Sequence, residues 1–252
     1  MDVESLFPVV VPGFFLSLIL AERLRPARPL PRVPGWRLLG VVALVVTGAV
    51  SSAVPLLYQD LVRAHRLLDL QWMGLLPGTA IAFLATELTG YWFHRGRHAV
   101  TPLWRIHQLH HSAERVDVFG SAFFHPLDIA GEGLVGSLTA TLLLGIAPEA
   151  AALAGLASVC LSLFQHANLR TPRWLGYLVQ RPESHSVHHA RGVHAWNYGL
   201  PLWDMAFGTF ENPERFEAEA GFYQGASRRL GAMLALRDVT RPPRSGRSAL
   251  AA

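Results

Sequence analysis

Histidine is concentrated at three places in this chain, and its spacing constrains the fold more than any other feature. Residues 94–98 read His-Arg-Gly-Arg-His, residues 107–111 read His-Gln-Leu-His-His, and residues 185–189 read His-Ser-Val-His-His. On an α-helix, positions i, i+3 and i+4 share one face, with side chains about 5 to 6 Å apart. Imidazoles at this spacing crowd one another unless a cation unites them. The three histidine boxes therefore predict helices that bind metal.

The number of histidines indicates more than one metal ion. Eight imidazoles in the three boxes exceed the roughly four to six ligand positions of one ion. Imidazole suits Zn, Cu, Fe and Ni, whereas Mg and Ca prefer oxygen ligands. A structural zinc site would need only about four ligands and would be closed. His65, which lies in a polar loop with Arg66 and Asp69, is instead expected to be an ordinary surface residue.

The composition favours a membrane protein. Of 252 residues, 51% are hydrophobic and only 16% are charged, which is unusually apolar for a soluble domain. All basic residues are arginines, and they lie in loops and the tail without interleaved stacking aromatics. This pattern fits membrane orientation and predicts no nucleic-acid partner. The single cysteine, Cys160, excludes an intrachain disulfide and a multi-thiolate metal site.

Apolar runs predict the path of the chain through the membrane. Three expected spans cover residues 7–21, 38–58 and 73–93. The arginine-rich loop 22–37 between the first two should be cytoplasmic by the positive-inside rule. The run 133–165 is interrupted at Pro148, which can begin a helix but not continue one, so we expect a hairpin that enters and leaves on the cytoplasmic side, or a half-span in its first arm. The fold class predicted is all-α, a polytopic membrane protein with about four to five membrane helices and a cytoplasmic histidine-rich helical cap.

Carboxylates are expected close to the histidines. Two ions held by neutral imidazoles alone would be strongly cationic, and a carboxylate can orient an imidazole through its second ring nitrogen. Glu87 lies within an expected span, where a carboxylate is often functional, although a hydrogen bond between helices is the alternative. Asp204 is expected to orient a ligand, or else to cap a helix or turn. The further candidates are Asp117, Asp128, Glu132 and Glu183.

The position of the boxes at the ends of apolar runs suggests the chemistry. A redox-active pair of irons beside a bilayer can bind and split dioxygen and so oxidise an unactivated C–H bond. A lipid can reach such a site from the membrane by sliding between the spans. The expected substrate is therefore a lipid.

Over roughly residues 87–210 the chain resembles the fatty acid hydroxylase and sterol desaturase superfamily of membrane di-iron oxidases. The first box resembles the family's in the sequence Tyr91-Trp-Phe-His94-Arg-Gly-Arg-His98, and the second in Leu103-Trp-Arg-Ile-His107-Gln-Leu-His110-His111-Ser. Two further segments resemble the elements that link the boxes in the family, namely Phe124-His125-Pro-Leu-Asp128 and Gln165-His166-Ala-Asn168. The family's last box is matched by Glu183-Ser-His185-Ser-Val-His188-His189. The sequence that follows this box in the family is matched by Asn197-Tyr-Gly and Trp203-Asp-Met-Ala-Phe-Gly-Thr209.

The resemblance implies a set of metal ligands and cofactors. The implied ligands are His94, His98, His107, His110, His111, His166, His185, His188 and His189. Residues that could be either ligands or groups around the metal are His125, His194, Glu87, Asp128, Glu183, Asn197 and Asp204. The implied cofactors are two iron ions, which zinc can replace in preparations, with O2 as co-substrate.

Three positions depart from the family pattern. The family usually has Asp where Glu87 stands, Arg where Phe123 stands and an acidic residue near Ala195. The change at residue 87 keeps the charge. The absence of an arginine that could meet an oxygenated lipid head leaves the class of lipid open.

The implied function is a membrane oxidase that uses dioxygen and external electrons to hydroxylate or desaturate a fatty acyl lipid, a sterol or a similar lipid. A carotenoid or ether-lipid oxidase is a variant of the same chemistry. A non-enzymatic membrane metal- or haem-binding protein is the alternative of another class, but its histidines should lie within the apolar runs and not at their ends. A zinc hydrolase is disfavoured because the H-E-x-x-H motif is absent.

A separate protein is expected to supply electrons. The chain has no G-x-G-x-x-G after a strand, no P-loop and no c-type haem motif. The expected donor is a ferredoxin or a cytochrome b5-like protein with its reductase, docking on the cytoplasmic face. Arg181, Arg191, Arg228 and Arg229 predict a basic landing patch for it, with a merely solvated surface as the alternative.

Three regions are expected along the chain. Residues 1–72 should form N-terminal membrane anchor helices, and residues 73–212 a fatty acid hydroxylase-like di-metal oxidase domain. Residues 213–252 should be a cytoplasmic C-terminal tail, largely disordered after residue 237 because it is rich in Arg, Pro and Ser without apolar periodicity. The expected location is a bacterial inner membrane, with the histidine boxes facing the cytoplasm. The oligomeric state is not predicted.

Overall fold

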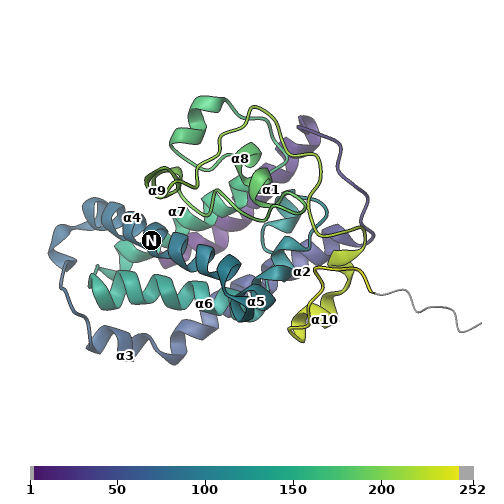
Figure 1. Cartoon of the computed structure of the whole chain (residues 1–252). Helices are drawn as coiled ribbons and strands as arrows, with labels where there is room; N and C mark the ends of the chain where they lie inside the picture. The colour runs from purple at the N-terminus through teal and green to yellow at the C-terminus, as the bar shows by residue number, and fades with distance from the viewer. Residues whose placement is uncertain (1–2, 244–252) are drawn as a thin grey trace, which may run out of the picture.

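The computed structural model describes residues 3–243, and all regular elements in this range are helical (Figure 1). The α-helices are α1 (Phe7–Leu24), α2 (Trp36–Ala53), α3 (Gln59–Ala64), α4 (Leu75–Ala99), α5 (Thr101–His111), α6 (Pro126–Ser137), α7 (Pro148–Gln165), α8 (Pro182–His188), α9 (Pro201–Ala206) and α10 (Leu230–Leu234). A π-helix, Leu138–Leu143, continues α6. Short 3-10 helices cover Glu4–Leu6, Val54–Leu57, Gln71–Met73, Val118–Gly120, Arg173–Tyr177 and Ala226–Arg228. The predicted all-α class is confirmed.

Proline determines where five of the helices begin. Pro102, Pro126, Pro148, Pro182 and Pro201 occupy the first turns of α5, α6, α7, α8 and α9. A proline ring fixes φ near the helical value, and the N–H it lacks has no partner in the first turn of a helix. The predicted helix start at Pro148 is therefore confirmed. Because α5 and α8 carry two histidine boxes, their prolines also set the register of the histidines.

Three helices are long and apolar enough to cross a membrane. They cover Phe7–Leu24, Trp36–Leu57 and Pro148–Gln165. Large apolar side chains on the first two face outward, with Leu16, Leu38 and Val45 exposed by 62%, 71% and 66%. Such surfaces are typical of contact with lipid and not with water. The three helices indicate an integral membrane protein.

The number of candidate spans is smaller than expected. Residues 73–93 fall mainly within α4, which is helical but is not among the three candidates in the described range. The first arm of the expected hairpin consists of α6 and the π-helix, and it is not a candidate either. Instead, α4 packs along α7 through small residues. An added Cβ at Gly78 would lie 3.2 Å from that of Ala150, and Ala82 is fully buried between the two helices.

A single residue separates α4 from α5. Val100 has extended dihedral angles, φ −109° and ψ 114°, which interrupt the helix between Ala99 and Thr101. The chain turns sharply there, and the two helices contact each other. This turn brings the first histidine box, at the end of α4, against the second box on α5.

The segment after α10 is packed against α5. Val239 is fully buried beside Leu109 and Met233. Gln108 donates to the carbonyl of Arg237 at 2.9 Å and accepts from the N–H of Val239 at 3.1 Å. The disorder expected after residue 237 is therefore not seen in residues 238–243, because an apolar anchor and two backbone hydrogen bonds hold them. Residues 244–252 lie outside the described range.

Candidate metal centre

All nine of the implied ligand histidines are gathered into two neighbouring groups. The first group consists of His94, His98, His107, His111 and His188. The second group consists of His110, His166, His185 and His189. Within each group, one ring nitrogen of every member lies within 4.8 Å of those of the others. Imidazoles of the two groups are in contact, since the rings of His111 and His189 stack with centroids 4.5 Å apart.

Helical spacing divides each H-x-x-H-H box between the two groups. On α5, His107 and His111, four residues apart, belong to the first group, and His110 belongs to the second. The box on α8 does the reverse. Its i, i+4 pair, His185 and His189, belongs to the second group, and His188 belongs to the first. Each of these helices therefore spans both groups, while α4 contributes only to the first and the end of α7 only to the second.

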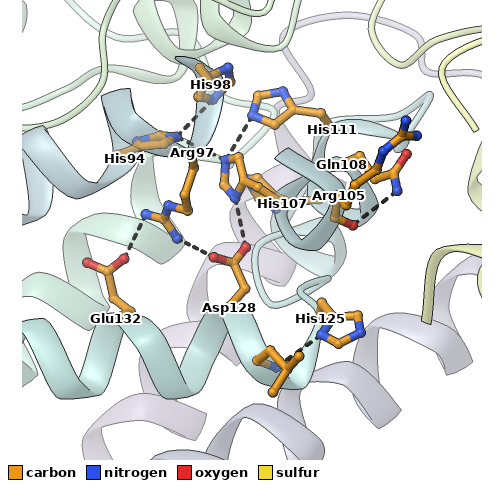
Figure 2. A network of polar contacts seen from close by, with 12 residues as sticks. His94, Arg97, His98, Arg105, His107, Gln108, His111, His125, Asp128 and Glu132 are labelled. Carbon is orange, nitrogen blue, oxygen red and sulfur yellow. Dashed lines mark hydrogen bonds and ion pairs between the residues drawn. The ribbon is translucent and has the colours of Figure 1, made fainter. Parts of the chain in front are cut away.

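Distances between the Nε2 atoms match those between ligands of a common ion. In the first group, His107 Nε2 lies 3.1 Å from both His94 Nε2 and His111 Nε2. In the second, His166 Nε2 lies 3.1 Å from His110 Nε2 and 2.9 Å from His185 Nε2. Two nitrogens bonded to one metal at about 2.1 Å, with an angle of roughly 90 to 105° between the bonds, are about 3.0 to 3.3 Å apart. Figure 2 shows four imidazoles of the first group turned toward one another.

The second ring nitrogen shows where the proton resides. His94 Nδ1 lies 2.6 Å from the Tyr198 carbonyl, His188 Nδ1 2.7 Å from the Trp196 carbonyl, and His166 Nδ1 2.6 Å from the Ser162 carbonyl. A carbonyl oxygen only accepts, so each of these Nδ1 atoms must carry the hydrogen. In a neutral ring the Nε2 atom then presents a lone pair.

Lone pairs therefore face one another inside the first group. Burial and the neighbouring imidazoles hold the pKa of His94 well below its usual value, and burial also lowers that of His107, so both rings are neutral. His107 donates through Nδ1 to Asp128, and its Nε2 atom meets that of His94 lone pair to lone pair. His188 Nε2 is buried without a hydrogen-bond partner in the described part of the chain. A shared cation relieves this repulsion, and the residues fit two metal ions.

Asp128 orients a ligand imidazole directly. From the first turn of α6, its carboxylate accepts from His107 Nδ1 at 2.7 Å and from Arg97 at 2.6 Å. Arg97 also donates to Glu132 at 2.7 Å and so lies between two carboxylates, as Figure 2 shows. Burial alone would raise the pKa of Asp128, but Arg97 and His107 hold it below its usual range. The ionised carboxylate fixes the tautomer and the direction of His107.

The loop of residues 194–198, in which the sequence indicated His194 and Asn197 but not the backbone carbonyls, orients two further imidazoles. The carbonyls of Trp196 and Tyr198 accept from His188 and His94, and the nearby backbone of His194 raises the pKa of His98 against the larger lowering effect of burial. Alternate residues, 194, 196 and 198, thus face the first group. His194, Trp196 and Asn197 have positive φ values of 44°, 65° and 47°, which side chains disfavour. The only signal in the sequence is Asn197-Tyr-Gly, since Asn and Gly tolerate this conformation.

Asn197 and Asp204 hold this loop in place. The amide of Asn197 donates to the Ser184 carbonyl and accepts from the Glu211 N–H, each at 2.8 Å. Asp204 accepts from the N–H groups of Tyr198 at 2.9 Å and Gly199 at 3.0 Å. Asp204 has no hydrogen bond to an imidazole within the described residues. Asp204 is connected to His94 only through Tyr198 of the loop. It therefore does not orient a ligand imidazole directly.

The remaining carboxylate candidates bind groups other than imidazoles. Glu87 accepts from Ser158 at 2.6 Å and so joins α4 to α7. Glu183, in the first turn of α8, accepts from the backbone and hydroxyl of Thr171 at 2.8 and 2.7 Å. Asp117 accepts from the Trp36 indole at 2.8 Å. These carboxylates support the helices that carry the histidines.

The two histidines whose role the sequence left open lie outside both groups. His125 caps α6 by accepting from the Leu127 N–H at 3.0 Å, and Figure 2 shows it apart from the four imidazoles. His194 is closer, with its Nδ1 atom 3.2 Å from Nδ1 of His111. A capping role accounts for His125, and a place beside the first group for His194.

Replacing Asp128 with Asn tests its orienting role. The amide keeps the shape of the side chain but removes the charge that faces His107 and Arg97, so we expect about 10- to 100-fold weaker metal retention, the range typical for groups that orient ligands. Iron per chain after dialysis against a chelator measures this. Glu149→Gln is the matched control, because Glu149 is an exposed carboxylate in the first turn of another helix, α7. Equal retention in the two variants would remove Asp128 from the centre.

Asp204→Asn tests the supporting role of the loop. One Asn amide hydrogen would face a backbone N–H of Tyr198 or Gly199, which we expect to cost roughly 1 to 3 kcal/mol of stability and about 10- to 100-fold in metal affinity. Asp60→Asn, an exposed carboxylate in the first turn of α3, controls for the loss of charge. Thermal unfolding and iron content are measured together. A less stable protein with full metal affinity would show that the loop does not position His94.

The chain is similar to proteins that are named as a monooxygenase, a hydroxylase and an oxidase of lipids. Human alkylglycerol monooxygenase is 30% identical over 79% of this chain and 46% of its own length. Ornithine lipid hydroxylase OlsE of Rhizobium tropici is 32% identical over 54% of this chain and 42% of its own length, and human lathosterol oxidase is 31% identical over 55% and 47%. The chain thus spans less than half the length of these relatives. No solved structure matches it.

A protein-family model covers the region that holds the two groups. The model described as fatty acid hydroxylase matches residues 79–209. This range is just over half of the chain, and it contains most of α4, all of α5 to α9 and all nine grouped histidines. The chain belongs to the fatty acid hydroxylase family.

Proposed function

We propose that this protein is a membrane di-iron oxidase that hydroxylates or desaturates a lipid with dioxygen and external electrons. The observation that carries the proposal is the pair of adjacent groups of five and four imidazoles, all buried except the half-buried His94 and His98, whose Nε2 atoms are spaced as ligands of two ions. Iron bound there would supply the activation of dioxygen needed to oxidise an unactivated C–H bond. The nine histidines are proposed as the ligands.

The residues of the chain contribute orientation and exclusion of water. Asp128 and the loop carbonyls of Tyr198 and Trp196 fix which nitrogen of His107, His94 and His188 faces the ion. Phe124 stacks on His110 with ring centroids 4.0 Å apart, and Trp104 packs beside His111 at 5.5 Å. These rings and the burial of the histidines keep bulk water from the centre, which protects a reactive site from side reactions.

Membrane helices suggest where the substrate comes from. The three candidate spans pack, directly or through neighbouring helices, against the helices that carry the histidines. A lipid can therefore approach from the bilayer without crossing water. The relatives act, by their names, on alkylglycerols, an ornithine lipid and lathosterol, which differ in head group. An ether lipid is the first substrate to test, because alkylglycerol monooxygenase aligns with the largest share of this chain among the three.

The finer organisation is also part of the proposal. Residues 1–72 act as membrane anchors, residues 73–212 as the di-metal oxidase domain and residues 213–252 as a cytoplasmic tail. In addition to the three candidate spans, α4 and the arm formed by α6 and the π-helix lie at least partly within the bilayer. The arginine-rich loop 22–37 and the histidine groups face the cytoplasm, as the positive-inside rule requires.

Reporter fusions test this orientation. Fusions after Arg32 and Ala252 should report a cytoplasmic location, and a fusion after His65 an external one, because α2 carries the chain from one side to the other. A reporter active only in the cytoplasm and one active only outside it are used in parallel. An external C-terminus would contradict the proposed hairpin at Pro148.

Metal content and product formation test the function. We expect about two irons per chain after anaerobic purification in detergent. With a chemical reductant, dioxygen and ether, acyl or sterol lipids, we expect an oxidised product by mass spectrometry. His110→Ala should lose iron and essentially all turnover, since it removes an imidazole from the second group, whereas His65→Ala, at an exposed position, should keep both. One tightly bound zinc under these conditions, or iron without any oxidised lipid, would refute the proposal.

A further inference from the structure

A cavity with three arginines in its walls is lined in part by the segments that follow the second and third histidine boxes in the sequence. It has a volume of about 550 Å³, and its walls include Arg32, Arg191 and Arg228 together with Glu114 and Glu219. Glu114 follows the last histidine of the second box by three residues, and Arg191 follows the last histidine of the third box by two. Two of the segments in its walls therefore come directly from the candidate metal centre, and the others are residues 31–34 and 218–228.

The acidic groups of this cavity already have partners, but two of its arginines do not. Glu114 accepts from the Gly225 N–H at 2.6 Å and from the Ser227 hydroxyl. Glu219 pairs with Arg191 at 2.8 Å. The guanidinium groups of Arg32 and Arg228 have no hydrogen bond or ion pair with any other residue that the structure describes, and both residues are exposed. The cavity therefore presents two free cations to an anionic partner.

A short bonded route joins the cavity wall to the second histidine group. The Arg191 N–H donates to the Glu219 carbonyl at 2.9 Å, and Ala190 forms a β-bridge with Ala220. Ala190 directly follows His189, a member of the second group. The route from Glu219 in the wall thus consists of its hydrogen bond to Arg191 and the backbone of Arg191 and Ala190, and it ends at His189. Electron transfer falls steeply with distance and is faster along bonded paths than across gaps.

We propose that this cavity is the docking site for an acidic one-electron donor protein of the iron–sulfur or haem class. The proposal rests on the function proposed above. In two successive dockings the reduced donor gives up one electron each time and leaves oxidised. The two electrons, with two protons from solvent, reduce one oxygen atom of O2 to water while the other enters the C–H bond of the lipid. Opposite charges speed such encounters and orient them.

This surface differs from the landing patch expected from the sequence. Arg181 is almost fully buried and donates to the carbonyls of Thr171 and Pro213, so it cannot meet a partner. Arg229 donates to the Tyr223 hydroxyl at 3.0 Å. Arg191 and Arg228 remain, and the fold adds Arg32 from the loop between α1 and α2, more than 150 residues away in sequence.

Absence of lysine from the chain makes a site-specific test possible. Arg32→Lys and Arg228→Lys each introduce one side-chain amine, which a carbodiimide can join to a carboxylate of a docked protein. The probe is an acidic plant-type [2Fe–2S] ferredoxin, mixed with the full-length protein in detergent. The matched control is Arg63→Lys, since Arg63 is exposed on α3, away from the cavity. At low ionic strength we expect at least about fivefold more cross-linked complex for the two cavity variants, lost at about 0.5 M salt.

Several outcomes would overturn the proposal. Cross-linking of the cavity variants no greater than that of Arg63→Lys would do so. The proposal would also be overturned if phosphatidylglycerol vesicles, and not ferredoxin, protected the introduced lysines from chemical modification. The cavity would then bind lipid head groups. The cross-link forms without iron or turnover. An inactive protein that still cross-links would therefore count against the proposed oxidase and not against the docking site.

Reduction kinetics give a second readout. In iron-loaded protein, the double variant Arg32→Glu/Arg228→Glu should be reduced about tenfold more slowly by ferredoxin at low ionic strength, and the difference should shrink as salt is added. Its reduction by dithionite should match that of the unmodified protein, because a small reductant needs no docking site. Arg63→Glu should match the unmodified protein with both reductants. Equal slowing with ferredoxin and dithionite would contradict a docking role.

Discussion

The contact on which the rest of this structure depends is that between ring nitrogens of neighbouring histidines, 2.9 to 3.3 Å apart. Where both nitrogens present lone pairs, as in His94 and His107, they repel each other, and burial prevents protonation from relieving the repulsion. A cation would relieve it, so metal binding would favour the folded state. The turn at Val100, the prolines at the helix starts and the loop after the third box all bring imidazoles into this otherwise unfavourable contact.

Each H-x-x-H-H box contributes histidines to both groups, so two helices, α5 and α8 with its C-cap residue His189, supply six of the nine grouped histidines. Its i, i+4 pair faces one group, and the histidine between them in the motif faces the other. Because α5 and α8 use the motif in opposite senses, each helix holds both groups at once and fixes the distance between them. A third helix, α4, and the end of α7 then complete one group each. Loss of either box would therefore disturb both groups and not one.

Support for the imidazoles comes mostly from backbone carbonyls and less from carboxylates. Asp128 is the one carboxylate found hydrogen-bonded to a grouped histidine among the described residues, whereas His94, His166 and His188 donate to carbonyl oxygens. Carbonyls orient a ring without adding full negative charge, so two divalent ions would leave the centre strongly cationic. Such a charge would favour reduction of the centre, and Arg32 and Arg228 at the cavity, unpaired among the described residues, would favour the approach of the acidic donor proposed above.

The sequence by itself predicted the all-α class, the helix start at Pro148 and the nine grouped histidines. These features are local: proline acts on its own backbone, and i, i+3 and i+4 spacing follows from helix geometry, so residues such as Pro148 and His107 were interpretable without a structure. Only the tertiary structure decided how the histidines divide into two groups, that Asp204 supports a loop and not a ring, and that Val239 is buried. It also decided that Arg32 joins Arg228 at one cavity while Arg181 is buried. These outcomes depend on contacts between segments far apart in the chain, and neither spacing nor composition encodes which distant segment a loop or an arginine will meet.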